Sequence, residues 1–216
     1  VKVGDDITLS YADADPVNYD ADGEVVYAID YGNNLISYSF ETPQNLGDAL
    51  GDAAADVYAI AGEGVAALAI NGAFVGSLTA FEGEKGYWLV ATNEFSFSFN
   101  SNDGTLARDA NAASVQELLD IQQFSSRMSE DPAYRTVQSD QQAFFFVNSA
   151  TIRGEALTNE DLIIAYNGEK VVGSRYWNSN SELTDVVVMG ESYNQFTGVL
   201  DERTAGYMKS GDEISF

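Results

Sequence analysis

One short turn sequence occurs twice in this chain, and it restricts the fold more than any other feature. Residues 71–77 read NGAFVGS and residues 167–174 read NGEKVVGS, and apolar runs flank both stretches. Asn-Gly between two apolar runs is a strong signal for a β-hairpin, because a type I′ turn needs positive φ at both of its central residues. The sequence therefore predicts two hairpins, far apart along the chain, that turn in the same way.

Short apolar runs separated by glycine fill most of the chain and are typical of β-strands. In EFSFSFN at 94–100, Phe95, Phe97 and Phe99 alternate with serines, so the three rings are expected on one buried face. The other stretches with a β pattern are 24–32, 35–40, 56–62, 66–70, 73–78, 86–91, 143–152, 161–168, 169–177, 184–190 and 205–216. The chain is therefore predicted to be mostly β.

A helical pattern appears in the middle of the chain. In SVQELLDIQQF at 114–124, Val115, Leu118 and Leu119 lie at helical spacing, and Ser114 with Glu117 forms a capping box. Two arrangements fit this helix: a connector between two β units, and a helix packed permanently on a sheet. A second stretch, QNLGDALGDAAAD at 44–56, is predicted to supply one short helical turn.

These patterns predict two small antiparallel β-sandwich-like units joined by a helix-containing connector. The order of turn signals is similar in the two halves; Gly86-Tyr87, for example, corresponds to Gly206-Tyr207. The predicted divisions are an N-terminal acidic segment and strand at 1–34, a first β unit at 35–100, a helical connector at 101–142 and a second β unit at 143–216.

The composition excludes several classes of function. The chain has 34 Asp plus Glu against 10 Lys plus Arg, a net charge of −24, so it repels phosphate backbones and anionic lipid surfaces. We therefore predict no nucleic-acid partner. No apolar run reaches the length of a membrane span, so no membrane insertion is expected. Cysteine and histidine are absent, which excludes disulfides, the usual zinc sites and Ser-His-Asp triads.

Two long stretches carry a resemblance to known proteins. The first is LISYSFETPQNLGDAL with AINGAFVGSLTAFEGEKGYWLV, and the second is QQAFFFVNSATIRGEALTNEDLIIAYNGEKVVGSRYWNSNSELTDVVVMG with TAGYMKSGDEISF. They resemble paired β modules of marine phage virion proteins and of secreted or surface proteins of aquatic bacteria. In that family a Gly-Lys-Gly-Tyr-Trp turn precedes a final strand, and here that turn is EKGYW at 84–88.

The resemblance implies an accessory or structural role without catalysis, and it transfers no functional residue to this chain. This sequence departs from the family at Ile164, where glycine is frequent, and it stops at Phe216, where relatives continue the strand. Because it also begins at Val1 without Met, we expect a processed chain or part of a longer protein.

An acidic loop near the start of the chain is the candidate metal site. Its oxygen-bearing side chains belong to Asp13, Asp15, Asn18, Asp20 and Asp22. Part of their spacing matches a calcium-binding loop, but Ile29 stands where such a loop needs a bidentate Glu, so a complete EF-hand is excluded. Two interpretations remain, a looser calcium site and a solvated acidic loop. Apart from calcium, no cofactor is predicted.

A long insertion in the second half of the chain is the candidate contact or glycan surface. Its aromatic and amide residues are Tyr176, Trp177, Asn178, Asn180, Tyr193, Asn194, Gln195 and Phe196. Sugar rings stack on aromatic faces while amides bond hydroxyls, and the same residue types form protein–protein contacts. A third interpretation places Trp177 in the core, with the remainder an ordinary loop.

Paired carboxylates could in principle catalyse glycoside hydrolysis, and five acidic residues are near in sequence: Glu182, Asp185, Glu191, Asp201 and Glu202. A chain with 34 acids brings carboxylates together by chance. We therefore predict that the protein is not an enzyme and has no catalytic residues.

The predicted function is a non-catalytic structural or surface protein, with a virion decoration, a fibre or a similar extracellular assembly component as the leading version. Its predicted location is a virion surface, or the extracellular space or cell surface. The predicted partners are other copies of itself or other virion or surface proteins. The alternative is a carbohydrate-binding accessory or adhesin module of a secreted bacterial protein, with a glycan as its partner.

Overall fold

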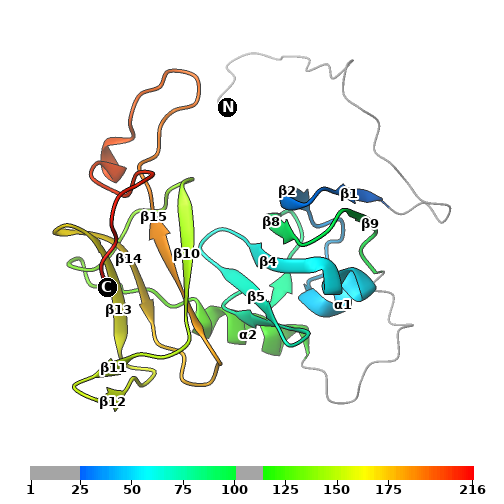
Figure 1. Ribbon diagram of the computed structural model, residues 1–216, viewed down its shortest axis with the longest axis horizontal. Helices are drawn as coiled ribbons and strands as arrows, with labels where there is room; N and C mark the ends of the chain where they lie inside the picture. Colours follow the sequence, from blue (N-terminus) through cyan, green and yellow to red (C-terminus); the bar gives the residue numbers. More distant parts are fainter. Residues whose placement is uncertain (1–24, 101–113) are drawn as a thin grey trace.

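The computed structural model describes residues 25–100 and 114–216. These residues form antiparallel sheets and two α-helices, which confirms the predicted mostly-β fold (Figure 1). Two clusters of buried apolar side chains are present, one formed by residues between 29 and 99 and the other by residues between 165 and 207. No helix in the described ranges is both long and apolar enough to cross a membrane.

The first cluster lies under a five-stranded antiparallel sheet with the strand order β2-β8-β4-β5-β6. Its strands are β2 (Gly32–Ser37), β8 (Gly86–Ala91), β4 (Val57–Ala61), β5 (Ala66–Ile70) and β6 (Ala73–Gly76). The remaining elements are β1 (Tyr27–Ile29) paired with β9 (Phe95–Phe97), β3 (Gln44–Asn45) paired with β7 (Ala80–Phe81), α1 (Leu46–Leu50) and η1 (Gly51–Asp56). We call this part of the molecule the first unit.

Aromatic rings fill the interior of the first unit. Phe81 is completely buried, and its ring lies 4.9–5.5 Å from the rings of Tyr38, Tyr87 and Phe99. The alternation at 94–100 has the predicted effect, because Phe97 and Phe99 are buried while Ser96 is exposed. Mutual edge and stacked contacts between rings stabilise such a cluster beyond the area that it buries.

The second unit is built from three strand pairs. These are β10 (Gln142–Val147) with β15 (Thr184–Met189), β13 (Leu162–Asn167) with β14 (Lys170–Tyr176), and β11 (Thr151–Ile152) with β12 (Glu155–Ala156). The interior is mainly aliphatic, with Val172, Val186, Val187 and Met189 completely buried, and it also contains the Tyr207 ring. A short 3₁₀ helix, η2 (Glu202–Thr204), follows in the segment after β15.

The two Asn-Gly sequences do not form the same turn, which corrects the prediction. Asn71 and Gly72 have φ of 51° and 83°, as a type I′ turn requires. In the second hairpin Asn167 pairs with Lys170, so the central residues are Gly168 and Glu169, and Gly168 alone of these has positive φ. Asn167 stays in its strand because its side-chain amide donates to the backbone oxygens of 206 and 207 and to the carboxylate of 212.

The Val-Gly-Ser part of the repeat does have the same role twice. A Cβ on Gly76 would lie 2.2 Å from the carbonyl oxygen of Ala66, and a Cβ on Gly173 would lie 2.1 Å from that of Val187. Only glycine allows a backbone to approach so closely. The serine that follows each glycine is buried in both cases. The repeat therefore marks two places where the backbones of two strands approach each other closely.

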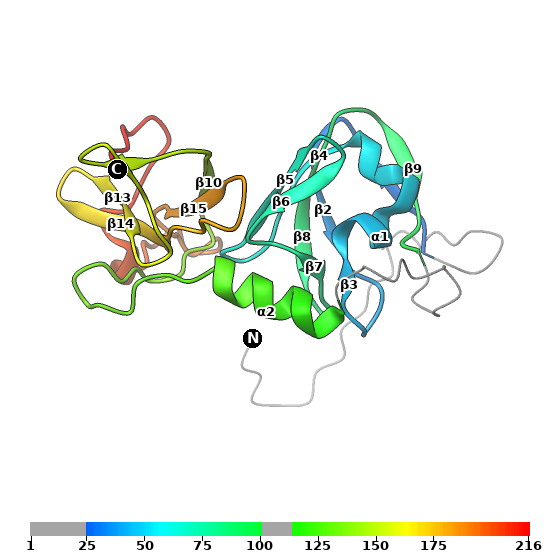
Figure 2. The ribbon, with the colours of Figure 1, turned by 90° about the horizontal axis from the view of Figure 1, so that it is seen from below.

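Helix α2 (Val115–Ser125) begins at the predicted capping box of Ser114 and Glu117. It packs on the first unit, where Thr79 donates to the Leu118 carbonyl at 2.6 Å. Its last residue, Ser125, accepts a hydrogen bond from the Asn178 amide of the second unit at 3.0 Å. Figure 2 shows the helix running beneath the first unit and ending where the two units meet. It is thus both packed on the first unit and in contact with the second.

A buried ion pair fastens the two units to each other. The Arg175 guanidinium of β14 lies 3.2 Å from the Asp185 carboxylate of β15, and both side chains are almost completely buried. Arg175 also donates to the Gly64 carbonyl of the first unit at 2.7 Å and to the Ser126 carbonyl after α2. From the first unit, the Ser77 amide and hydroxyl donate to Asp185 at 2.6 and 2.7 Å. We call this group of residues the inter-unit lock.

Candidate contact surface

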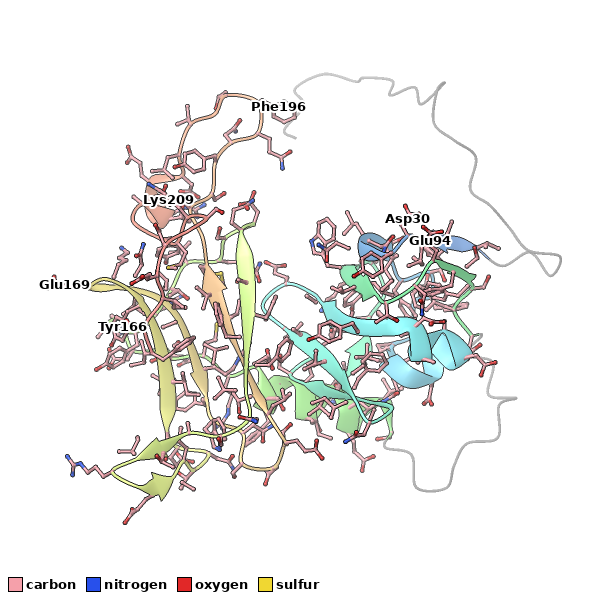
Figure 3. The ribbon with its side chains drawn as sticks, viewed as in Figure 1. Asp30, Glu94, Tyr166, Glu169, Phe196 and Lys209 are labelled. Carbon is pink, nitrogen blue, oxygen red and sulfur yellow. The ribbon has the colours of Figure 1, made fainter. Side chains whose placement is uncertain are left out.

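The segment after β15 contains a hairpin that projects from the second unit. Tyr193 and Leu200 form an antiparallel bridge, and the Asn194 amide donates to the Val199 carbonyl at 2.9 Å. The Asp201 amide donates to the Ser192 carbonyl at the same distance. We call residues 192–201 the contact hairpin. Figures 1 and 3 show it standing away from the strands of the second unit.

A single asparagine fixes the tip of the contact hairpin. The Asn194 side-chain oxygen accepts from the amides of Phe196 and Thr197 at 3.0 and 2.9 Å, and its carbonyl accepts from Gly198. Asparagine side chains commonly form turns of this kind. The Phe196 side chain at the tip is 96% exposed, and Figure 3 shows it pointing away from the molecule.

A network around Glu191 holds the base of the contact hairpin. The Glu191 carboxylate accepts from the Tyr193 hydroxyl, accepts from the Gly206 amide at 3.0 Å and forms an ion pair with Lys209 at 3.2 Å. The hydrogen bond from Tyr193, followed by that from Gly206 and the charge of Lys209, holds the pKa of Glu191 below its ordinary value of 4.5. The carboxylate is therefore charged at neutral pH and orders the segment around it.

A groove of about 510 Å³ lies between the base of the contact hairpin and strands β10 and β15. Phe145, Val188 and Met208 give it an apolar lining, while Tyr193 and Gln195 contribute polar groups. Glu191 and Lys209 also line it with charges that are paired with each other, and the exposed Asp140 adds a carboxylate. A groove with an apolar floor and a few polar side chains suits a small ligand or part of a protein partner.

The eight residues of the predicted contact or glycan surface do not form one surface. Four of them, Tyr193, Asn194, Gln195 and Phe196, belong to the contact hairpin. The others lie at the junction of the two units, beside the end of α2. There Trp177 is 8% exposed, so its ring cannot serve as a stacking surface for a sugar.

The junction residues have structural contacts instead. Asn178 is buried and bonds Ser125 and Thr184, while the Tyr176 ring lies 5.1 Å from the Arg127 guanidinium. Asn180 is exposed and lies beside a hollow of about 520 Å³ between β6 and α2. The interpretation that Trp177 belongs to the interior therefore agrees with its burial.

The acidic residues considered for catalysis also have structural partners. Asp185 belongs to the inter-unit lock, and Glu191 belongs to the hairpin base. Asp201 caps η2 and forms an ion pair with Arg203 at 2.6 Å. Arg203 holds the pKa of Asp201 below its ordinary value through hydrogen bonds. Glu182 and Glu202 are exposed.

The candidate calcium loop lies outside the described residues. Asp13, Asp15, Asn18, Asp20 and Asp22 all precede residue 25, so calcium binding there stays a prediction. Among residues 25–100 and 114–216, no group of three or more Asp or Glu side chains is arranged to hold a metal ion.

The sequence analysis missed the inter-unit lock. The only available signal was a single charged residue inside each of two apolar stretches, Arg175 in VVGSRYW and Asp185 in TDVVVM. Charged side chains are rarely buried unless they are paired, so two such residues of opposite sign predict each other as partners. Their contacts with Gly64 and Ser77 depend on how the units meet, and no local pattern indicates them.

Comparison with protein-family models, with curated proteins and with solved structures gives no match to this chain. The candidate contact surface has two distinct parts, the exposed tip of the contact hairpin and the groove at its base.

Proposed function

We propose that the protein is a non-catalytic component of an extracellular assembly, in the leading version a virion decoration or fibre protein. In this proposal the contact hairpin binds a neighbouring protein, which is another copy of the chain or another virion or surface protein. The location is a virion surface, or the extracellular space or cell surface.

The observation that carries the proposal is the exposed phenylalanine on an ordered hairpin. Phe196 is 96% exposed, yet its backbone amide and that of Thr197 both donate hydrogen bonds to the Asn194 side-chain oxygen. Large aromatic side chains are the usual anchors of protein interfaces. Ordering the hairpin before contact lowers the entropy that binding would otherwise cost. An exposed ring on a fixed hairpin is thus suited to contact with a partner.

Two further features support a structural role. The inter-unit lock joins both units through buried charges, so that the contact hairpin is carried on a body with a fixed shape. The net charge of −24 makes free molecules repel each other in solution. Binding is therefore favoured only at sites where apolar contacts or cationic groups offset this repulsion.

The groove at the base of the contact hairpin favours a second candidate function, carbohydrate binding by an accessory or adhesin module. Tyr193 offers an aromatic ring, and Gln141 and Gln195 offer amides beside an apolar floor. Sugars are bound by this combination of groups. In this version the sugar would lie in the groove, and not on Trp177 as the sequence suggested.

The test combines electron microscopy with light scattering on the wild-type chain and on Phe196→Ser. The proposal expects ordered oligomers or filaments that Phe196→Ser prevents without lowering the melting temperature. Ile152→Ser is the matched control, because Ile152 is also an exposed apolar residue but lies in β11, away from the contact hairpin. If Phe196→Ser and Ile152→Ser assemble equally well, the contact hairpin does not bind the neighbouring protein.

A glycan array separates the two candidate functions. Glycan binding that Gln195→Ala abolishes, without oligomers of the wild-type chain, would replace the assembly proposal with the carbohydrate one. Release of sugar from any member of a polysaccharide panel would contradict both versions.

A further inference from the structure

The two Asn-Gly pairs of the repeat are chemically identical, but the structure places them in different surroundings. Asn71 and Gly72 are the central residues of the turn between β5 and β6, and both are exposed. In residues 25–100 and 114–216, no group holds the Asn71 side chain by a hydrogen bond. Water and hydroxide therefore reach this side chain, and it can rotate freely.

The Asn167 side chain is held in place by a distant segment of the chain. Its amide donates hydrogen bonds to the carbonyls of Gly206 and Tyr207, both at 3.3 Å, and to the Asp212 carboxylate at 3.2 Å. Asn167 is also half-buried, whereas Asn71 is exposed. A rotation of the Asn167 side chain would therefore break hydrogen bonds to three acceptors, each of which contributes to stability.

The strands behind the two turns also differ in how firmly they are held. β6 is the edge strand of the five-stranded sheet, and Ile70 with Ala73 is the pair that closes the first turn. β13 pairs with β14, and in addition the Tyr166 amide donates to the Ser215 carbonyl at 2.8 Å and the Ser215 amide donates back at 3.1 Å. Opening the end of an edge hairpin is a small local event, whereas the second turn opens only if contacts with a distant segment also break.

Asparagine followed by glycine can react with its own backbone. In this reaction hydroxide removes the proton of the glycine amide, and the backbone nitrogen attacks Cγ of the asparagine. An N–Cγ bond forms while the bond from Cγ to the side-chain nitrogen breaks, and that nitrogen takes a proton from water and leaves as ammonia. Water then opens the five-membered imide ring at either carbonyl and gives aspartate or isoaspartate. Glycine favours the reaction because it has no Cβ to hinder the attacking nitrogen.

Closure of the imide ring brings the asparagine Cβ and the next backbone nitrogen to the same side of the Cα–C bond. A type I′ turn and a β-strand both hold these atoms apart, so either segment must open briefly before it reacts. The space beside the two glycines does not differ, since a Cβ on Gly72 or on Gly168 would meet no atom within 4 Å. The two sites therefore differ in the cost of opening and in the freedom of the asparagine side chain.

We infer that Asn71 is a site of spontaneous deamidation, and that the fold protects Asn167 in the same dipeptide. Each molecule modified at Asn71 gains a carboxylate, which adds one negative charge to the net charge of −24. Isoaspartate carries the main chain through its side-chain carbon, so the turn between β5 and β6 gains a backbone atom. This modification site goes beyond the proposed function and does not depend on it.

Peptide mapping of the folded full chain after incubation at pH 8.5 tests the inference. Cleavage after glutamate gives the peptides 64–82 and 161–169, each with one Asn-Gly pair. Mass spectrometry detects the replacement of the amide by a carboxyl group, and isoaspartyl methyltransferase labels isoaspartate. We expect peptide 64–82 to be modified at least about tenfold faster than peptide 161–169, because the first turn opens more easily. Its rate should fall at lower pH, since hydroxide starts the reaction.

The chain unfolded in guanidinium chloride is the matched control, because it keeps both sequences and removes the fold. There the two peptides should be modified at similar rates. Asp212→Ala removes one acceptor of the Asn167 amide, so it should speed the reaction at Asn167 and leave that at Asn71 unchanged. Equal rates for the two peptides in the folded chain would overturn the inference. A difference that persists in the unfolded chain would overturn it too, because neighbouring residues and not the fold would then protect Asn167.

Discussion

The two units are built from similar glycine-turned hairpins, but they are stabilised by different means. Aromatic rings fill the first unit, and Leu35 and Trp88 of its sheet stay exposed. Aliphatic side chains fill the second unit, and its side toward the first unit is fastened by the buried pair of Arg175 and Asp185. Removing one partner of a buried ion pair leaves an uncompensated charge, so the junction of the two units depends on both side chains being present.

A buried tyrosine has the same role in both units. The Tyr87 hydroxyl accepts from the Glu82 amide at 2.8 Å, and the Tyr207 hydroxyl accepts from the Val137 amide at 2.7 Å. Burial raises the pKa of Tyr87 to about 12, so this hydroxyl keeps its proton in neutral solution. The two Gly-Tyr pairs that correspond in the sequence therefore also correspond in the structure.

The largest expected effect follows from breaking the inter-unit lock. Arg175→Ala leaves the Asp185 carboxylate buried without its cation and removes donors from the Gly64 and Ser126 carbonyls. Breaking a buried ion pair on one side costs about 3–5 kcal/mol, and we expect about 5 here because a cavity is also created. Urea unfolding measures this loss. The double variant Arg175→Met with Asp185→Leu should recover part of the stability, because it leaves no unpaired buried charge although the carbonyls still lack donors, and equal instability of the two variants would contradict the role of the charges.

The aromatic core of the first unit should respond next most strongly. Phe81→Ala removes a ring that contacts Tyr38, Tyr87 and Phe99, and we expect a loss of about 4 kcal/mol in the free energy of unfolding. Calorimetry checks the size of the loss. Tyr58→Ala is the control, because Tyr58 is 55% exposed and should change stability little. Similar losses in both variants would mean that the rings do not form the core.

The two serines of the repeat allow a finer comparison. Ser77 donates to the charged Asp185, whereas Ser174 accepts from the Ser129 amide at 3.1 Å. Hydrogen bonds to charged groups contribute about 1.5–3 kcal/mol and neutral ones about 0.5–1.5 kcal/mol. Ser77→Ala should therefore cost about 2 kcal/mol and Ser174→Ala about 1 kcal/mol in denaturant unfolding. The reverse order would show that Ser77 does not serve the inter-unit lock.

The smallest expected effect is a local response of the second unit to pH. Because the folded-state pKa of Glu191 is lowered, its stabilising contribution is complete above its ordinary value of 4.5 and is lost as pH falls through the folded-state value. Exchange of the Gly206 amide, corrected for its intrinsic rate, should accelerate in acid. Glu191→Gln should weaken this protection already at pH 7. Protection of Gly206 that is equal at pH 7 and pH 3 would exclude the proposed network.

Much of the fold was predictable because its signals are local. Most strand positions, the capping box of Ser114 and Glu117 and the buried face of Phe97 and Phe99 follow from spacing alone. The β pattern predicted at 205–216 was wrong as a strand, since only isolated bridges at Met208 and Ser215 form there. The turn at 167–170 was predicted wrongly, because the contacts of Asn167 with a distant segment decide its geometry. The order of strands in the first sheet also had no local signal.

The candidate surface was predictable only in part. The residues from Tyr193 to Phe196 lie in an exposed segment, as an insertion rich in aromatic and amide groups suggests. Trp177 lies in a stretch of similar composition, but its side chain is buried. Its backbone amide donates to the Asp161 carbonyl at 2.8 Å, which holds the chain at the junction of the two units. Burial of a side chain depends on its neighbours in space, and these are set by the inter-unit lock.

Hydroxyl-radical footprinting of the chain, at low and at high protein concentration, tests most directly whether the contact hairpin supplies contacts between molecules. It reports the accessibility of individual side chains. We predict that Phe196 on the contact hairpin becomes protected at high concentration, while Ile152 stays reactive. Unchanged reactivity of Phe196 in molecules that are associated would contradict this account.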